Sequence, residues 1–429
     1  MHKIFLLLLT LALVNLIRGQ QVNDIIATSA AERIEKILSS DSLQGRATFS
    51  PGIAMASAFI ENEFKKTGLQ FFAGLNSYRQ EFSMTETKNN TAKVIIDGAA
   101  IPDSNFVVVS FAPQVSLTQN DAVEIIHIDS VSELRSKIKQ VFKSNKNQLV
   151  LADSSLRKFG SRLVNVGSTT MDTTGKSVVI VFGVKAANNF SVELTNTINK
   201  KPLNNVVGVL PGKTKPGEYV IFSGHYDHLG IGTPDSTRDS IYNGANDDAA
   251  GTTAVILLAN YFKTLHNNAR TLVFVTFTAE EVGGFGSSYF SNQLDPAKVV
   301  AMFNIEMIGT DSKWGNNSAY ITGYEKTDMG KILEKNLAGS KFKFYPDPYP
   351  EQQLFYRSDN ATLARQGVPA HTISTSKMDS EKYYHTQGDE IETLDINNMT
   401  EIIKAIAISA ASIISGQDTP SRVDTSELR

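Results

Sequence analysis

The chain has 429 residues, enough for more than one folding unit, because single hydrophobic cores stop growing near roughly 250–300 residues. Its 41 Lys and Arg nearly balance its 44 Asp and Glu, and the formal net charge of −3 argues against a nucleic-acid partner or an anionic membrane surface. Cysteine is absent, which excludes disulfides, thiolate metal ligands and cysteine nucleophiles.

The start of the chain is typical of a signal peptide. Lys3 precedes an almost wholly apolar run of 11 residues from Ile4 to Val14, and the chain turns polar before Gly19. This run has the length of a signal-peptide core and is shorter than the ~20 residues that a membrane-spanning helix needs. We therefore predict a signal peptide over residues 1–19, export to the periplasm or the exterior, and no stable membrane insertion after its removal. An uncleaved anchor is the alternative.

Residues 20–90 are predicted to form the first part of the main domain. Ile34 and Leu38 share one face of a first helix, because residues four apart are neighbours on a helix surface. A second helix is predicted from Ala54 to Thr67, and Gly68 follows as a helix-ending glycine.

Residues 91–201 are predicted to form a smaller, inserted, β-rich domain. One helical stretch is expected near Ser132 to Phe142, whereas the rest reads as short runs rich in β-branched residues. These runs fall at residues 93–96, 106–109, 123–126 and 178–181.

Residues 202–416 alternate between predicted strands and helices. Apolar strands separated by helices predict an α/β fold with a mostly parallel sheet that helices cover on both faces. The strands are expected at Tyr219–Ser223, Leu272–Thr278, Val299–Ile305 and Ala370–Ser374, and the helices at Ala249–Thr264 and Met399–Ser415. The polar tail over residues 417–429 is expected to be flexible.

Polar side chains follow three of these strands. His225 and Asp227 come after the first strand, Glu280 and Glu281 after the second, and Glu306 after the third. Ligands of open α/β sheets bind outside the carboxyl ends of the strands, so we expect these groups to meet in one crevice.

Each candidate has a simpler structural explanation when it is taken alone. Asp247 and the aspartate after it precede a predicted helix, where an Asp commonly caps free N–H groups. Glu280 and Glu281 could be a solvated pair, His225 a hydrogen-bonded core histidine, and His385 a surface histidine. As a set, two imidazoles and three carboxylates without a thiolate suit zinc or a similar divalent ion.

Two chemical roles follow for carboxylates in such a set. A carboxylate such as Asp247 can bridge two ions at the ~3.5–4 Å spacing of two-metal hydrolases. An adjacent Glu that holds no metal can take a proton from a water that the metal activates.

Five sequence blocks resemble the M28 family of zinc peptidases. They are SGHYDHLG at Ser223–Gly230, NGANDDAAG at Asn243–Gly251, FTAEEVG at Phe277–Gly283, NIEMIG at Asn304–Gly309 and YHT at Tyr384–Thr386. The resemblance covers Ser29 to about Leu69 and Pro202 to Ser415. It implies a fold of the zinc exopeptidase type, and the inserted segment lies where relatives often carry a protease-associated domain.

The resemblance also implies a division of roles among the residues. It gives Asp247 as the ligand that bridges two zinc ions per chain, His225 with Glu306 at one ion, and Glu281 with His385 at the other. It further implies Glu280 as the general base and Asp227 as the carboxylate that orients His225.

Three positions carry less defined expectations. Tyr384 matches a tyrosine that in some members hydrogen-bonds the developing oxyanion, although a packed aromatic is an equal alternative. Glu306 stands where many members carry Asp. Arg357 begins a stretch that resembles the pocket-lining Arg-Ser-Asp-His of other members, with Asn360 in place of His, and is a candidate substrate contact.

These features predict an exported two-zinc exopeptidase that acts on peptides. Aminopeptidase activity is favoured, because it is the commonest activity among exported bacterial relatives. The alternatives are a carboxypeptidase and a one-zinc glutaminyl cyclase. From a different class, a non-catalytic binding ectodomain would be expected to lack ligands or the base, and none is missing here.

Overall fold

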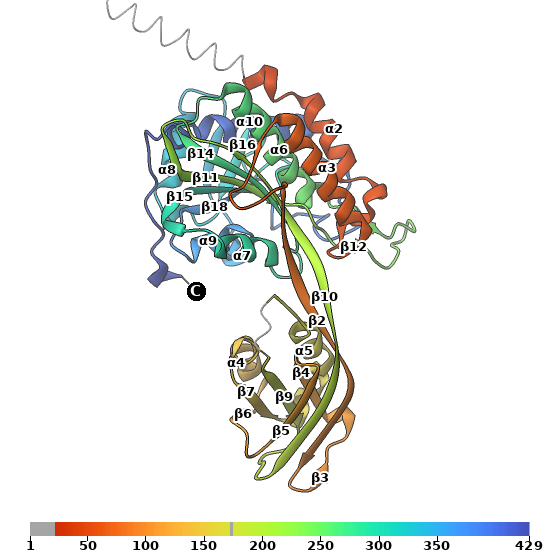
Figure 1. Ribbon diagram of the computed structural model, residues 1–429. Helices are drawn as coiled ribbons and strands as arrows, with labels where there is room; N and C mark the ends of the chain where they lie inside the picture. Colours follow the sequence, from red (N-terminus) through yellow and green to blue (C-terminus); the bar gives the residue numbers. More distant parts are fainter. Residues whose placement is uncertain (1–21, 172–174, 429) are drawn as a thin grey trace, which may run out of the picture. The chain divides into compact units, whose positions relative to one another are not determined.

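The structure is a computed structural model that describes residues 22–171 and 175–428 (Figure 1). The predicted signal peptide lies outside the described residues. Within them, no helix has both the length and the apolar character to cross a membrane. The contacts divide the chain into two units, of which the first comprises the chain up to Glu81 and Asn204–Arg429, and the second Phe82–Leu203.

The first unit is built on a mixed α/β sheet whose central strands are parallel. The strands run in the order β17 (Lys343–Pro346), β16 (Ser318–Ile321), β18 (Ala370–Ser374), β15 (Val299–Ile305), β11 (Lys215–His225), β14 (Arg270–Phe277) and β10 (Phe190–Leu210). β18, β15, β11 and β14 pair in parallel, whereas β10 joins β14 antiparallel and β16 joins β18 antiparallel. The prediction of a mostly parallel α/β sheet is confirmed.

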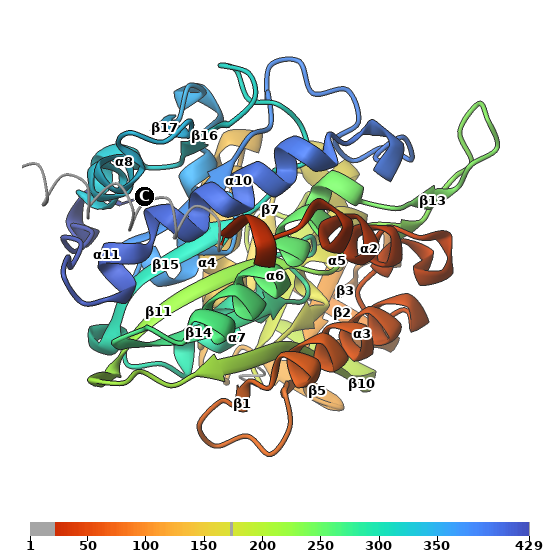
Figure 2. The ribbon, with the colours of Figure 1, turned by 90° about the horizontal axis from the view of Figure 1, so that it is seen from above.

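Helices cover both faces of this sheet, as Figures 1 and 2 show. On one face lie α2 (Thr28–Leu38), α3 (Pro51–Thr67), α6 (Ala250–Leu265) and α10 (Ile396–Ser409), and on the other α7 (Phe285–Asn292) and α9 (Asn360–Ala364). Successive strand residues point to opposite faces, so Phe222 belongs to the first core and Ile221 to the second. Helices exclude water from both faces of the sheet, which explains why the strands are apolar throughout.

An aromatic stack fills the centre of the larger core. Phe222 on β11 packs face to face with Phe303 on β15 at 4.9 Å and with Phe274 on β14 at 5.6 Å. All three rings are fully buried. The three parallel strands that lead to the polar edge of the sheet therefore also pack against one another through buried aromatic side chains.

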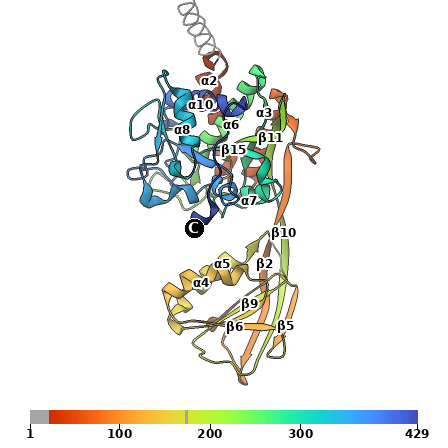
Figure 3. The ribbon, with the colours of Figure 1, turned by 90° about the vertical axis from the view of Figure 1, so that its left-hand side faces the viewer.

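The second unit has a four-stranded sheet with helices of its own (Figure 3). Its order is β4 (Phe106–Ser110), β9 (Ser177–Phe182), β7 (Asn147–Ala152) and β6 (Val123–Ile128), and its helices are α4 (Val131–Lys143) and α5 (Gly160–Gly167). β6, β7 and β9 pair in parallel. It is therefore a small α/β unit, with more helix than the β-rich pattern predicted.

The boundary of the second unit falls earlier than the sequence analysis placed it. β2 runs without a break from Arg79 to Ile96, so the unit begins at Phe82 rather than at residue 91. The polar middle of this strand carries no Gly or Pro that would signal a boundary, and its apolar end alone was read as a strand.

The polar tail is packed onto the first unit, contrary to the expectation of a flexible segment. The buried guanidinium of Arg270 donates to the carbonyl oxygen of Asp418 at 2.7 Å and to the hydroxyl of Thr419 at 2.5 Å. Val423 is 4% exposed, and Arg422 donates to the carbonyl oxygen of Val299 at 2.8 Å. A buried guanidinium needs acceptors, and the tail supplies a backbone carbonyl oxygen and a hydroxyl, whose partner on a distant strand the polarity of the tail does not reveal.

Candidate metal centre

The candidate ligands lie at one edge of the central sheet. β11 ends at His225, and its parallel neighbours β14 and β15 end at Phe277 and Ile305, directly before the loops that carry Glu280, Glu281 and Glu306. Asp247 comes from a short π-helical segment, Ala245–Ala249, before α6. His385 lies in the loop between β18 and α10. The structure thus brings together all five residues that the sequence proposed as ligands.

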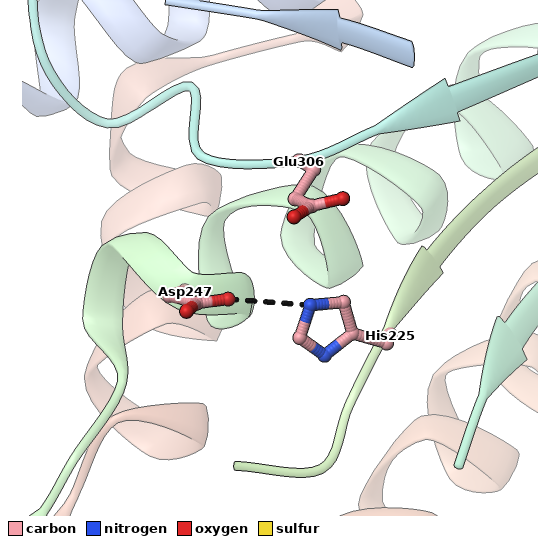
Figure 4. Close-up of side chains that lie close together, drawn as sticks. All are labelled: His225, Asp247 and Glu306. Carbon is pink, nitrogen blue, oxygen red and sulfur yellow. Dashed lines mark ion pairs between the residues drawn. The ribbon is translucent and has the colours of Figure 1, made fainter. Parts of the chain in front are cut away.

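His225, Asp247 and Glu306 form a first group (Figure 4). Nε2 of His225 lies 3.2 Å from Oδ1 of Asp247, and one donor atom from each of the three residues falls within 4.8 Å of the others. Nδ1 of His225 lies 3.1 Å from the carbonyl oxygen of Asp227, which fixes the ring so that Nε2 faces the group. Oε2 of Glu306 is buried without a hydrogen-bond partner, and burial raises the pKa of this carboxyl to about 7.

A second group shares Asp247 with the first. Nε2 of His385 lies 3.3 Å from Oδ2 of Asp247 and 3.2 Å from Oε2 of Glu281. Nδ1 of His228 lies 2.8 Å from Oε1 of Glu281 and 3.9 Å from Oδ2 of Asp247. The two oxygens of Asp247 therefore face different histidines, which is the arrangement that a bridging ligand requires.

The charges of this cluster fit a bound cation. The ion pairs of Asp247 and Glu281 in the described chain are with histidine rings only. Hydrogen bonds with both carboxylates raise the pKa of the His385 imidazole to about 10, so the site attracts positive charge. Although burial acts to raise it, hydrogen bonds with His225 and His385 lower the pKa of Asp247 and keep it ionised.

The distances also fit zinc. Ligand bonds of ~2.0–2.2 Å in a tetrahedron place neighbouring donor atoms about 3.3–3.5 Å apart. The contacts of His225 and His385 with the carboxylates, at 3.2–3.3 Å, are close to this spacing. Nitrogen and oxygen donors without sulfur also suit this ion. The residues of the two groups therefore fit zinc, and the groups have Asp247 in common.

Asp247 and Asp248 make different contacts. Asp248 accepts hydrogen bonds from the backbone N–H groups of Gly251 and Met307 through Oδ1, and from that of His225 through Oδ2. The capping alternative considered for this pair thus applies to Asp248, which ties the start of α6 to two strand ends. Asp247 is left to face the histidines. The peptide bond between them is cis.

Asp227 is placed differently from the expected carboxylate partner of His225. Its carboxylate accepts from the backbone N–H groups of Glu280, at 3.1 Å, and Glu281, at 3.3 Å. Its Oδ1 lies 3.8 Å from Nδ1 of His225, beyond hydrogen-bond distance, and its backbone carbonyl makes the contact instead. Asp227 therefore holds the turn that carries both glutamates and orients His225 through its main chain.

The two glutamates of that turn differ in their surroundings. The carboxylate of Glu281 contacts two histidines, whereas in the described chain that of Glu280 takes part in no hydrogen bond or ion pair. Burial raises the pKa of Glu280 well above its usual range. Glu280 is thus a carboxylate with a raised proton affinity beside the ligands and outside their contacts.

A cavity that is partly open to solvent lies beside Glu306. Its lining includes Glu306, Met307, Tyr320, Thr322, Leu354, Arg357, Ser358, Thr372, Ser374, Met378 and Tyr384. The ring of Tyr384 stacks on that of His385 with centroids 4.0 Å apart. Asn360 is buried behind the cavity and donates to the carbonyl oxygens of Phe355 and Ala370, so the departure from the family's histidine falls on a packing residue.

Two further residues hold the loop before Asp247. The guanidinium of Arg46 donates to the carbonyl oxygens of Tyr226, Asn243 and Gly244 at 2.5–2.9 Å. Asp389 accepts from the backbone N–H groups of Asn246 at 2.8 Å and Asp247 at 3.0 Å. Both side chains are 1% exposed. Sequence reasoning did not find them, because their partners are up to 198 residues away in the chain.

His228 was also not proposed as a site residue. It stands within the block that supplied His225, so its position was visible in the sequence, but nothing there distinguished a histidine that faces Glu281 from one that packs in the core. The three-dimensional arrangement makes that distinction.

Comparisons with known proteins cover the part of the chain that carries these groups. The model of peptidase family M28 matches residues 205–410. A probable leucine aminopeptidase of Trichophyton verrucosum (strain HKI 0517) is 28% identical over 242 residues, which are 54% of this chain and 60% of that protein. One of Arthroderma otae is 26% identical over 280 residues, 61% of this chain and 71% of that protein. The chain thus matches about 60–70% of the length of these relatives.

Solved structures share the fold. An aminopeptidase from Aneurinibacillus sp. strain AM-1 superposes with a TM-score of 0.55 at 16% identity and covers 95% of this chain and 98% of its own. A zinc aminopeptidase from Bacillus subtilis superposes with a TM-score of 0.53 at 15% identity, over 93% of this chain and 98% of its own. At these identities the likeness is one of fold.

Proposed function

The chain belongs to peptidase family M28, and from this membership we propose that it is an exported, two-zinc aminopeptidase. The observation that carries the proposal is that Asp247 presents one oxygen to His225 and the other to His385, close to Glu306, which lines a cavity. His225 and Glu306 would complete one zinc site, and Glu281 and His385 the other. Export rests on the apolar run near the start of the chain.

The residues supply a route for peptide hydrolysis. Two zinc ions, when bound, polarise the peptide carbonyl and lower the pKa of a water molecule. Glu280 takes the proton from the attacking water and returns it to the leaving amine, since its carboxylate is not occupied by another contact. Tyr384 lines the cavity next to His385, from where its hydroxyl can donate to the oxygen of the attacked carbonyl.

We propose that cleavage starts at the amino end of the peptide. Met307, Leu354 and Met378 give the cavity an apolar part that suits an aliphatic side chain. The relatives that are named leucine aminopeptidases agree with this direction.

A carboxypeptidase is the second candidate, because Arg357 lines the same cavity. Its guanidinium is solvent-exposed and donates to Oε1 of Gln352 at 3.2 Å. A guanidinium can bind a terminal carboxylate through two parallel hydrogen bonds. In an aminopeptidase, Arg357 contacts the peptide without recognising its end.

The direction is tested with a peptide panel on the purified protein. We expect cleavage of leucyl peptides with a free amino group, no cleavage of the same peptides after N-acetylation, and tolerance of C-terminal amidation. A chelator should abolish the activity and zinc should restore it. Loss of activity on C-terminal amidation, together with dependence on Arg357, would favour the carboxypeptidase.

A further inference from the structure

His228 contacts a proposed zinc ligand through one ring nitrogen. Its side chain is fully buried, and Nδ1 lies 2.8 Å from Oε1 of Glu281. On its other side the ring lies against Gly244, where a Cβ atom would come within 2.6 Å of ring carbons of His228. The ring is therefore confined to this position by the backbone of the loop that precedes Asp247.

The distances distinguish two roles for this histidine. Donor atoms on one tetrahedral zinc would be about 3.3–3.5 Å apart. His385 is 3.2 and 3.3 Å from the two carboxylates, which is near this spacing, whereas His228 is 2.8 Å from one and 3.9 Å from the other. A distance of 2.8 Å is typical of an N–H···O⁻ hydrogen bond. His228 is thus placed as a donor to Glu281 rather than as a further ligand.

We propose that His228 is a positioning residue that fixes how Glu281 presents its carboxylate to the metal. Nδ1–H donates to Oε1, so that only Oε2, the oxygen that faces His385, remains to bind zinc. The backbone N–H of Glu281 is held at the same time by Asp227 at 3.3 Å. Glu281 is therefore held both at its backbone N–H and at one oxygen of its carboxylate.

This inference rests on the proposed zinc site and assigns it a partner that the family resemblance did not imply. Ligating carboxylates that accept a hydrogen bond keep one orientation, and loss of such a partner commonly lowers metal affinity by about 10–100-fold. Nδ1 is the nitrogen of His228 that contacts Glu281, and Nε2 has no hydrogen-bond partner among the described residues.

The test measures zinc binding by His228→Ala and His228→Asn, in competition with a chromogenic chelator. The side-chain amide of Asn occupies nearly the position of Nδ1 and can donate the same hydrogen bond, whereas Ala cannot. We expect His228→Ala to lower the affinity for one of the two zinc ions by about 10–100-fold. In His228→Asn, the affinity for that ion should be within a few-fold of the wild type.

Two further variants make the outcome specific. His385→Asn should lower the affinity for the same zinc ion, because an amide is a poor replacement for a zinc-binding imidazole. Asn should therefore fail at position 385 although it succeeds at position 228. His266→Asn is the matched control, since His266 is exposed at the end of α6 in a left-handed conformation that Asn tolerates. It should bind zinc as the wild type does.

Three results would overturn the inference. If His228→Asn lowers zinc affinity as much as His385→Asn does, His228 is a ligand. If neither His228 variant changes zinc affinity, Glu281 does not depend on it. If the wild type itself binds fewer than two ions, the two-zinc proposal fails as well, and the wild-type titration alone reveals this.

Discussion

Glu280→Gln removes the carboxylate that acts as base in the proposed mechanism and leaves the proposed ligands in place. In the described chain this carboxylate takes part in no hydrogen bond or ion pair, so an amide of the same shape disturbs no contact. The backbone N–H of Glu280 still donates to Asp227. We therefore expect the variant to fold and to bind two zinc ions as the wild type does.

The expected loss of rate follows from the environment of Glu280. A positioned general base contributes about 10²–10⁴-fold, which corresponds to about 2.7–5.4 kcal/mol in the activation free energy. Burial raises the pKa of Glu280, which brings its proton affinity nearer to that of an ideal base at neutral pH. We expect kcat to fall by an amount within this range.

The assay combines kcat on a leucyl peptide with zinc content determined by mass spectrometry. Glu281→Gln is the matched control, because it changes the next residue in the same way but removes a charge that faces two histidines. The control should lose zinc, whereas Glu280→Gln should lose rate at full zinc content. A Glu280→Gln enzyme that retains kcat within about tenfold, or one that loses zinc, would refute the reasoning.

Three further predictions concern groups outside the reacting atoms. Asp389→Asn replaces one acceptor oxygen by a donor that faces a backbone N–H, and it should lower zinc affinity by about 10–100-fold in a chelator competition while the protein stays folded. Burial raises the pKa of Glu35 to about 8, above its value in the unfolded chain, so the stability from its neutral form is complete below pH 4.5 and lost as the pH rises through 8. In thermal denaturation from pH 5 to 9, Glu35→Gln should therefore lose less stability than the wild type, and equal losses would contradict the assignment. Phe222→Ala opens a cavity in the aromatic stack and should lower the free energy of unfolding by about 3–5 kcal/mol in urea denaturation; a change below 1 kcal/mol would show that the core refills it.

Local patterns in the sequence predicted several strands and the residues that follow them. The bounds of β15 and β18 agree with the predicted strands. For β15 the signal is an apolar run that ends where Glu306 follows. The predicted strands that correspond to β11, β14 and β15 placed His225, Glu281 and Glu306 at neighbouring strand ends, and the structure brings these residues together.

Other features depend on contacts that no local pattern encodes. Whether Asp247 or Asp248 caps α6 was open in the sequence, because both are acidic residues before a helix, and only the positions of Met307 and His225 decide it. The buried Arg46 looks like any surface arginine until the carbonyl oxygens of distant loops are seen around its guanidinium.

The hydrogen bonds of Arg46 and Asp389 with the loop before Asp247 affect the order in which the protein folds. Arg46 is synthesised early and Asp389 late, and the loop that they fix, residues 243–247, lies between them. A chain that emerges from its N-terminus cannot close this loop until nearly all of it is available. The loop that presents Asp247 therefore reaches its final conformation only after residues from both ends of the chain have packed against it, so the proposed metal centre is completed late in folding.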